Sequence, residues 1–225
     1  MSKASVLLFL LFTSYHCAAQ EKAIAEVHYK FYHINDTTKR DQPQRDDVVT
    51  YLGKTSAYYT SYTPEIMRKD IAAQKAIADF KGHMTLHFNT TAIGEFYLLK
   101  SDIKRMEKVE AVSSSFDAFT YSVPWEEQDW EILDDIMEIG GYSCQKAITN
   151  FKGRRYEAWF TTELPFAFGP WKLHGLPGLI LEARDDKGEV RFEYGGFDKT
   201  HGNIKVELPY YVIRSTPFEI EKLKQ

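Results

Sequence analysis

The chain has 225 residues, of which 44% are hydrophobic and 15% aromatic, and its formal net charge is −4. This length predicts one domain, and the composition excludes a disordered tail, a collagen-like fibre and a disulfide scaffold. An acidic balance lacks the summed positive charge that binds phosphate backbones, so we expect no nucleic-acid partner.

Residues 1–19 have the order of a secretory signal peptide. Lys3 supplies the positive start, residues 4–12 form a short apolar run, and Ala19 is a small residue suited to a cleavage site. The run is too short to cross about 30 Å of hydrocarbon. We therefore expect cleavage after Ala19, a single mature domain over residues 20–225, no transmembrane span in it, and a periplasmic, cell-envelope or secreted location. Lipidation at Cys17 is the alternative.

Strand and helix patterns alternate along the mature chain. Residues 23–32 predict a half-buried strand, residues 35–47 a polar loop, and residues 48–62 a second strand region. One long amphipathic helix is predicted over 64–80, with Thr63 as N-cap, Pro64 in its first position and Gly82 placed to end it.

The second half of the chain predicts mainly strands. They are expected over 84–89, 95–100 and 108–123. Two hairpins follow, formed by 142–151 with 154–161 and by 179–184 with 189–197, each joined by a glycine-containing turn. Thr216 and Glu219 form a capping box that predicts a short helix over 218–224.

Successive hairpins and one central helix favour a mainly β fold of the α+β class. We expect a curved antiparallel sheet or partial barrel packed on the 64–80 helix, with a short C-terminal helix. A β-sandwich is the alternative.

Residues 168–181 combine turn dipeptides with an apolar burst. Gly169-Pro170 and Pro177-Gly178 predict two reversals, and the leucines between and after them are too apolar for a solvated loop. The segment is interpreted as a structural corner, where glycine is needed because no side chain fits. A rigid lip on an apolar pocket is the alternative.

The same segment resembles the GLPGLI family of Bacteroidota envelope proteins, which is named for the motif at 175–180. Three further elements, at 141–147 (GYSCQKA), 153–160 (GRRYEAWF) and 169–172 (GPWK), are similar to family elements in the same order. The resemblance implies a Bacteroidota source and a signal-bearing envelope protein, but no mechanism. The binding residues that it suggests are Gly169, Pro170, Lys172, Gly175, Leu176, Pro177, Gly178, Leu179 and Ile180.

No catalytic or metal motif stands out. Cys144 is interpreted as a buried, inert thiol and His174 as an exposed loop residue, although either is a possible catalytic group. His83 and His87 have the spacing of zinc ligands on a helix, but the alternation around them predicts a strand, on which they would lie about 13 Å apart. We therefore expect neither a metal site nor a cofactor.

Three functions are compatible with these observations. The favoured hypothesis is an exported, non-enzymatic protein that binds an apolar or peptide ligand or an envelope partner on its sheet, because the chain is aromatic-rich without a chemical constellation. The first alternative is an extracytoplasmic hydrolase using His174 or Cys144. The second is an interaction module that recruits an outer-membrane or periplasmic protein at a sheet edge.

Overall fold

The computed structural model describes residues 21–77, 82–84, 95–112, 117–200 and 204–224. The described part contains two helices, α1 (Thr63–Lys75) and α2 (Pro217–Leu223). Its strands are β1 (Ala25–His33), β2 (Gln44–Leu52), β3 (Ser56–Ser61), β4 (Glu95–Lys100), β5 (Arg105–Val112), β6 (Asp117–Val123), β7 (Glu131–Ile139), β8 (Tyr142–Phe151), β9 (Arg154–Thr161), β10 (Leu179–Asp185), β11 (Val190–Lys199) and β12 (Ile213–Arg214).

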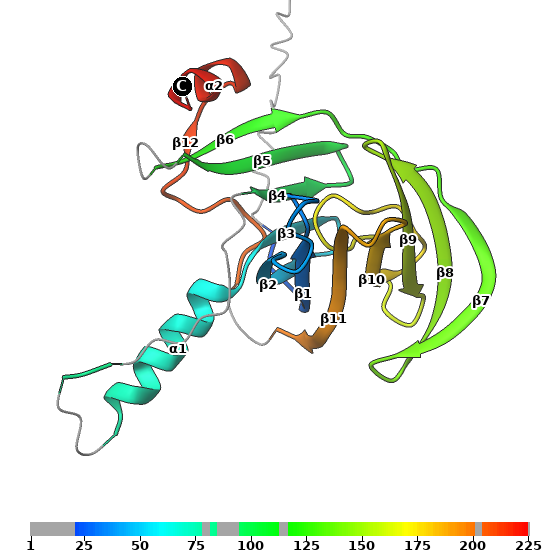
Figure 1. Cartoon of the computed structure of the whole chain (residues 1–225), viewed down its shortest axis with the longest axis horizontal. Coiled ribbons are helices and arrows are strands. Elements are labelled where there is room, and N and C mark those ends of the chain that lie inside the picture. The colour runs from blue at the N-terminus through cyan, green and yellow to red at the C-terminus, as the bar shows by residue number, and fades with distance from the viewer. Residues whose placement is uncertain (1–20, 78–81, 85–94, 113–116, 201–203, 225) are drawn as a thin grey trace, which may run out of the picture.

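All of these strands belong to one mainly antiparallel sheet. Its order is β12-β6-β5-β4-β3-β2-β1-β11-β10-β9-β8-β7, and the single parallel pair among the described strands is β12 with β6. The sheet is open and strongly curved, so that β7, β8 and β9 bend round the loop that follows β9 (Figure 1). The prediction of a mainly β fold built on a curved antiparallel sheet is confirmed.

Both predicted hairpins are confirmed. β8 and β9 are joined by Lys152 and Gly153, which have φ values of 52° and 76°. Two successive residues with positive φ form the turn whose twist matches that of paired strands. In the second hairpin, Asp185 accepts hydrogen bonds from the main-chain N–H of Glu189 (2.7 Å) and of Val190 (3.0 Å), which fixes the turn before β11.

The main core lies on the inner face of the curved sheet. Alternate residues of β1, namely Val27, Tyr29 and Phe31, point into it and are buried. The loop between β9 and β10 fills the hollow from inside, with Leu173 and Leu176 at most 1% exposed. The irregular segment 162–178 therefore covers the inner face of the sheet.

The predicted packing of the long helix against the sheet is not confirmed. α1 ends at Lys75 rather than Phe80, none of its residues is buried, and it projects from the sheet (Figure 1). Its apolar stripe is weak, since Ile66 is 41% exposed, and the loop already occupies the place that the helix was expected to fill. Residues 78–81, at the end of the predicted helix, lie outside the described residues.

The start of α1 differs from the sequence prediction, whereas the start of α2 agrees with it. The N-cap of α1 is Tyr62 rather than Thr63, whose hydroxyl donates instead to Asp46 (2.7 Å). The capping box of Thr216 and Glu219 at the start of α2 is confirmed.

The loop predicted over 35–47 is shorter than expected, because β2 begins at Gln44. Most of the strand predicted over 84–89 lies outside the described residues. No described helix has both the length and the apolar character needed to cross a membrane.

Candidate functional site

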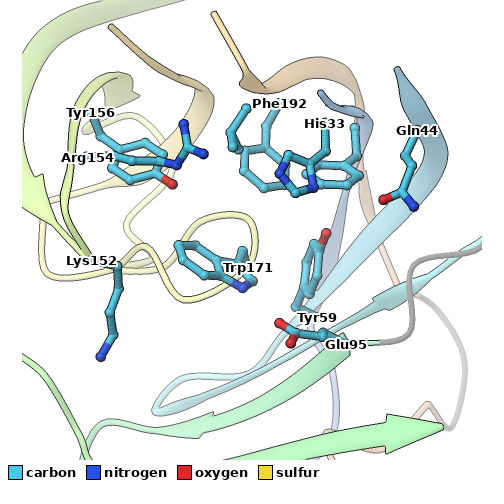
Figure 2. Close-up of a pocket in the computed structure, with 11 residues that line it drawn as sticks. His33, Gln44, Tyr59, Glu95, Lys152, Arg154, Tyr156, Trp171 and Phe192 are labelled. Carbon is cyan, nitrogen blue, oxygen red and sulfur yellow. The ribbon is translucent and has the colours of Figure 1, made fainter. Parts of the chain in front are cut away.

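A cavity of about 420 Å³ opens on the core-bearing face of the sheet. It is lined by side chains from several strands, from the β8–β9 turn and from the loop that fills the hollow (Figure 2). These residues are Phe31, His33, Gln44, Tyr59, Glu95, Lys152, Arg154, Tyr156, Trp171, Val190 and Phe192.

One wall of the cavity is built where β1 and β11 pair. Phe31 lies directly opposite Phe192, and His33 opposite Val190. The rings of Phe31 and Phe192 are 4.9 Å apart, and the ring of Tyr59 meets Phe192 edge-on at 6.3 Å. Strand alternation places all of these side chains on the same face, so the wall is a rigid consequence of the register.

The facing wall is formed by Trp171 from the loop. Its backbone has a φ of 56°, a left-handed conformation that is uncommon for a residue with a bulky side chain. Its indole ring contacts the rings of Phe151 (5.8 Å), Tyr156 (6.3 Å) and Tyr97 (6.4 Å). Strain of this kind persists when the surrounding packing fixes it, and here three aromatic neighbours hold the indole in place.

Lys172 lies against the same indole ring. Its Nζ is 4.1 Å from the ring centroid of Trp171, 5.1 Å from that of Tyr97 and 5.9 Å from that of Phe151. Burial lowers the pKa of Lys172 to about 8, although the nearby Glu95 acts in the opposite direction. The aromatic faces favour the ammonium form, whereas the loss of water disfavours it.

The charged groups at the cavity are already paired. Arg154 forms ion pairs with Asp185 and, at 2.7 Å, with Glu189. Lys152 pairs with Glu126, and Glu95 accepts hydrogen bonds from Lys108 and from Tyr97. Burial lowers the pKa of His33, which favours its neutral form. The cavity therefore offers aromatic surface bordered by neutralised polar groups.

These described lining residues supply no thiol or aliphatic hydroxyl that His33 could activate as a nucleophile. Aromatic faces, a neutral imidazole and a few fixed hydrogen-bonding groups are suited to binding an apolar or amphipathic group.

The residues suggested by the family motif mostly build the corner rather than the cavity. Gly169, Pro170, Leu176, Gly178, Leu179 and Ile180 are buried, whereas Gly175 and Pro177 are exposed. A Cβ on Gly178 would lie 2.0 Å from the carbonyl oxygen of Thr161, so no side chain fits there. Lys172 is half-buried and reaches the cavity wall through the indole of Trp171. The segment thus contains both a tight corner and, in Trp171, part of a pocket wall.

His174 is buried rather than exposed, which corrects the expectation from the sequence. Only 2% of it is exposed, its main-chain N–H donates to Gln128 (2.8 Å), and its carbonyl oxygen accepts from the indole N–H of Trp130 (2.8 Å). Its ring packs on Trp125 at 4.2 Å, and burial lowers its pKa. The residue fixes the loop between β9 and β10.

Cys144 is the buried thiol that the sequence predicts. It is inaccessible to solvent, and burial raises its pKa to about 11, which disfavours the reactive thiolate. Neither Cys144 nor His174 lines the cavity. Of the two histidines with zinc-like spacing, His83 is exposed and His87 lies outside the described residues.

Most of the cavity was not found from the sequence. Its walls come from positions far apart in the chain, and only the register of β1 with β11 brings Phe31 and Phe192 together. Arg154 and Tyr156 stand within the GRRYEAWF element, and Trp171 within GPWK, so the family resemblance did mark part of the lining.

Comparison with known proteins gives a family of unknown function and a fold. Residues 148–182, which run from the end of β8 into β10 and include the motif at 175–180, match the family described as "Protein of unknown function (Porph_ging)". No curated protein matches the chain.

Solved structures of PNGF-II are similar in fold. In the P21 crystal form the identity is 16% with a TM-score of 0.56, over 91% of this chain and 33% of that chain. In the C2 form the identity is 14% with a TM-score of 0.57, over 89% of this chain and 32% of that chain. The chain spans about a third of the length of PNGF-II. It is similar to the Porph_ging family over residues 148–182 and shares its fold with one part of PNGF-II.

Proposed function

We propose that this chain is an exported cell-envelope protein that binds the apolar or aromatic group of a peptide or small ligand without converting it chemically. The aromatic cavity on the inner face of the sheet is the observation that carries the proposal. The signal-peptide pattern over 1–19 supports export, and it supports a periplasmic or cell-envelope location.

Membership of the GLPGLI family of Bacteroidota forms part of the same proposal. Four sequence elements in order support it, and the stretch that matches the family of unknown function contains the GLPGLI motif itself. The likeness to PNGF-II is a likeness of fold and supplies no activity.

The size and chemistry of the cavity define the ligand class. A volume of about 420 Å³ falls within the range of small-molecule sites and admits one or two ring-sized groups. Phe31, Tyr59, Trp171 and Phe192 offer ring faces and edges, and aromatic contacts favour offset-stacked or edge-to-face geometries. His33 and Gln44 at the border can orient a polar part of the ligand through hydrogen bonds.

The proposal is tested by closing the cavity with one substitution. His33→Trp places an indole at the border, whereas Lys30→Trp places the same side chain at an exposed position of the same strand, on its opposite face. Binding of the apolar dye 1-anilinonaphthalene-8-sulfonate is followed by its fluorescence, and binding of N-acetyl-tryptophanamide is followed by calorimetry.

We expect both ligands to bind wild type and Lys30→Trp alike, and His33→Trp to bind them about tenfold or more weakly. Unfolding curves of both variants verify that each is folded. Equal binding by the two variants, or no binding by the wild type, would refute the proposal.

A second candidate is the edge-recruitment function, which the exposure of β7 favours. β7 ends the sheet and pairs only with β8 among the described strands, and Ile132, Ile136 and Met137 on it are exposed. A free edge with apolar side chains can accept a strand from an outer-membrane or periplasmic partner. A photo-crosslinking residue at Ile136 should capture one defined partner in cells, whereas the same group at the exposed Lys187 should not. Identical products from both positions would refute this candidate.

The alternative of an extracytoplasmic hydrolase needs Cys144 or His174 to reach a substrate. Both are buried, and neither lines the cavity, so no observation favours it.

A further inference from the structure

Three potential metal ligands converge on the outer face of the sheet, opposite the aromatic cavity. Glu26 and His28 of β1 and Asp198 of β11 each offer one ligand atom, and these atoms all lie within 4.8 Å of one another. The Oε1 of Glu26 and the Nε2 of His28 are 3.2 Å apart. Two ligands bound tetrahedrally to zinc at about 2.1 Å lie about 3.4 Å apart, so this pair already has the required spacing.

Strand pairing places the three side chains together. Glu26 and His28 are two residues apart on β1 and share its outer face, since Val27 and Tyr29 between and after them are buried. Asp198 lies directly opposite Glu26 in the β1–β11 ladder. The backbone thus fixes the origins of all three side chains, and only side-chain rotation remains to close the site.

A β-bulge lies beside His28. The β1–β11 register shifts between His28 and Tyr29, and His28 lies opposite Gly196, next to Gly195. A Cβ on Gly195 would come within 3.1 Å of the carbonyl oxygen of His28, so the glycine permits the close approach of the two strands. Bulges are over-represented next to functional sites, where they redirect side chains.

The electrostatics of this cluster favour a cation. Like charges directly opposite each other in a ladder destabilise it, and Glu26 and Asp198 are such a pair. Among the described residues, Asp198 forms no ion pair with a basic side chain, and the nitrogen in contact with the Oε1 of Glu26 is the Nε2 of His28, at 3.2 Å. Lys69 of α1 lies nearby, but its Nζ donates a hydrogen bond to the hydroxyl of Tyr62. This bond raises the pKa of Lys69 more than the charge of Glu26 does, so Tyr62 is the stronger partner of Lys69.

The imidazole ring of His28 packs against an aromatic neighbour. The ring of Tyr62 packs against His28 edge-on, with ring centroids 4.5 Å apart. The side chains of His28 and Glu26 are 19% and 18% exposed, so both are partly accessible from solvent. A packed imidazole that is partly accessible from solvent is suited to metal ligation.

We propose that Glu26, His28 and Asp198 bind a divalent first-row transition metal ion, with zinc as the best fit. One imidazole and two carboxylates are a mixed nitrogen and oxygen set, and three protein ligands with an open fourth position are typical of accessible zinc sites. The site shares no residue with the aromatic cavity, so this proposal does not depend on the proposed function.

The test uses untagged protein freed of metal with a chelator and titrated with zinc in a calorimeter. Wild type should bind one zinc ion with an affinity that His28→Ala and Asp198→Asn each reduce about tenfold or more. His33→Ala is the matched control, because His33 lies on the same strand but lines the cavity on the other face. It should bind zinc as the wild type does, as should His83→Ala at an exposed position elsewhere.

Two results of the titration would overturn the proposal. One is zinc binding by His28→Ala at wild-type affinity, which would place the ion elsewhere, and the other is the absence of binding by the wild type. Zinc should also raise the midpoint of thermal unfolding of wild type but not of His28→Ala, because a ligand that binds only the native state stabilises it. An equal rise in both proteins would count against the site.

Discussion

The hydroxyl of Tyr29 donates a 2.7 Å hydrogen bond to the main-chain carbonyl oxygen of Ile180, 151 residues further along the chain. Both residues are buried, with 1% and 0% of their surface exposed. The bond ties the inner face of β1 to the end of the corner segment as it enters β10. It therefore connects the strand that carries one cavity wall to the segment that carries the other.

Loss of this hydroxyl should weaken the fold. Tyr29→Phe leaves a buried carbonyl oxygen without its donor, and we expect the free energy of unfolding to fall by about 1–2 kcal/mol. Chemical denaturation followed by circular dichroism measures the change. Tyr32→Phe, on the outer face of the same strand, is the matched control and should be nearly neutral. An equal loss in the two variants would show that the Tyr29–Ile180 bond has no special role.

The corner at Gly178 should tolerate no side chain. A Cβ there would lie 2.0 Å from the carbonyl oxygen and 2.6 Å from the carbonyl carbon of Thr161, and backbone atoms cannot move aside cheaply. Gly178→Val should lower the free energy of unfolding by more than about 3 kcal/mol, or prevent folding altogether.

Gly175 requires glycine for its backbone conformation, whereas Gly178 requires it for lack of space. It has a φ of 92°, and no neighbouring atom lies within 4 Å of the place that a Cβ would occupy, so an added methyl group meets backbone strain without a clash. Gly175→Ala should therefore cost about 1–2 kcal/mol and leave a folded protein. Thermal unfolding of both variants is the measurement, and a Gly178→Val protein as stable as the wild type would contradict the interpretation of the corner.

Lys172 should react as an unusually nucleophilic amine. Burial lowers its pKa from 10.5 to about 8, so about half of it is neutral at pH 8, and the neutral fraction rises with pH and falls below that value. Acetylation by an N-hydroxysuccinimide ester, followed by peptide mass spectrometry, should modify Lys172 several-fold faster than Lys108 at pH 8.

Lys108 is a suitable control because its pKa is raised. Partial burial acts to lower that pKa, but Glu95 and Glu110 beside the ammonium outweigh the effect of burial. In denaturant the two lysines should react at similar rates, since the difference depends on the folded environment. If Lys172 reacts no faster than Lys108 in the native protein, the aromatic rings hold the ammonium more strongly than burial disfavours it, and the expected shift is wrong.

Local patterns predicted the two hairpins and the C-terminal helix because the causes of these elements are local. The β8–β9 hairpin follows from Lys152-Gly153, and α2 from the capping box at Thr216. The predicted packing of the 64–80 helix on the sheet is not confirmed. Amphipathicity tells which side of a helix can be buried, but not whether another segment covers the inner face of the sheet instead. Here the segment 162–178 supplies that cover, with Leu173 and Leu176 buried beneath the sheet.

The candidate sites depend on contacts that no local pattern encodes. The local pattern places Trp171 only within the apolar corner over 168–181. Trp171 and Phe192 line the same cavity because the whole sheet is curved. Glu26 and His28 form a strand pattern that is visible in the sequence, but Asp198 joins them only through the β1–β11 register. The cluster of Glu26, His28 and Asp198 could be predicted only if the pairing of β1 with β11 were known.

The most direct test of ligand binding in the cavity uses the chain's four tryptophans. Trp171 is the one of them that lines the cavity, whereas Trp159 is half-buried elsewhere on the sheet. With 5-fluorotryptophan incorporated, and the Trp171 signal assigned by Trp171→Phe, addition of N-acetyl-tryptophanamide should shift the fluorine resonance of Trp171 saturably and leave that of Trp159 unchanged. A Trp171 resonance that stays in place at saturating ligand, or equal shifts at both tryptophans, would contradict the account.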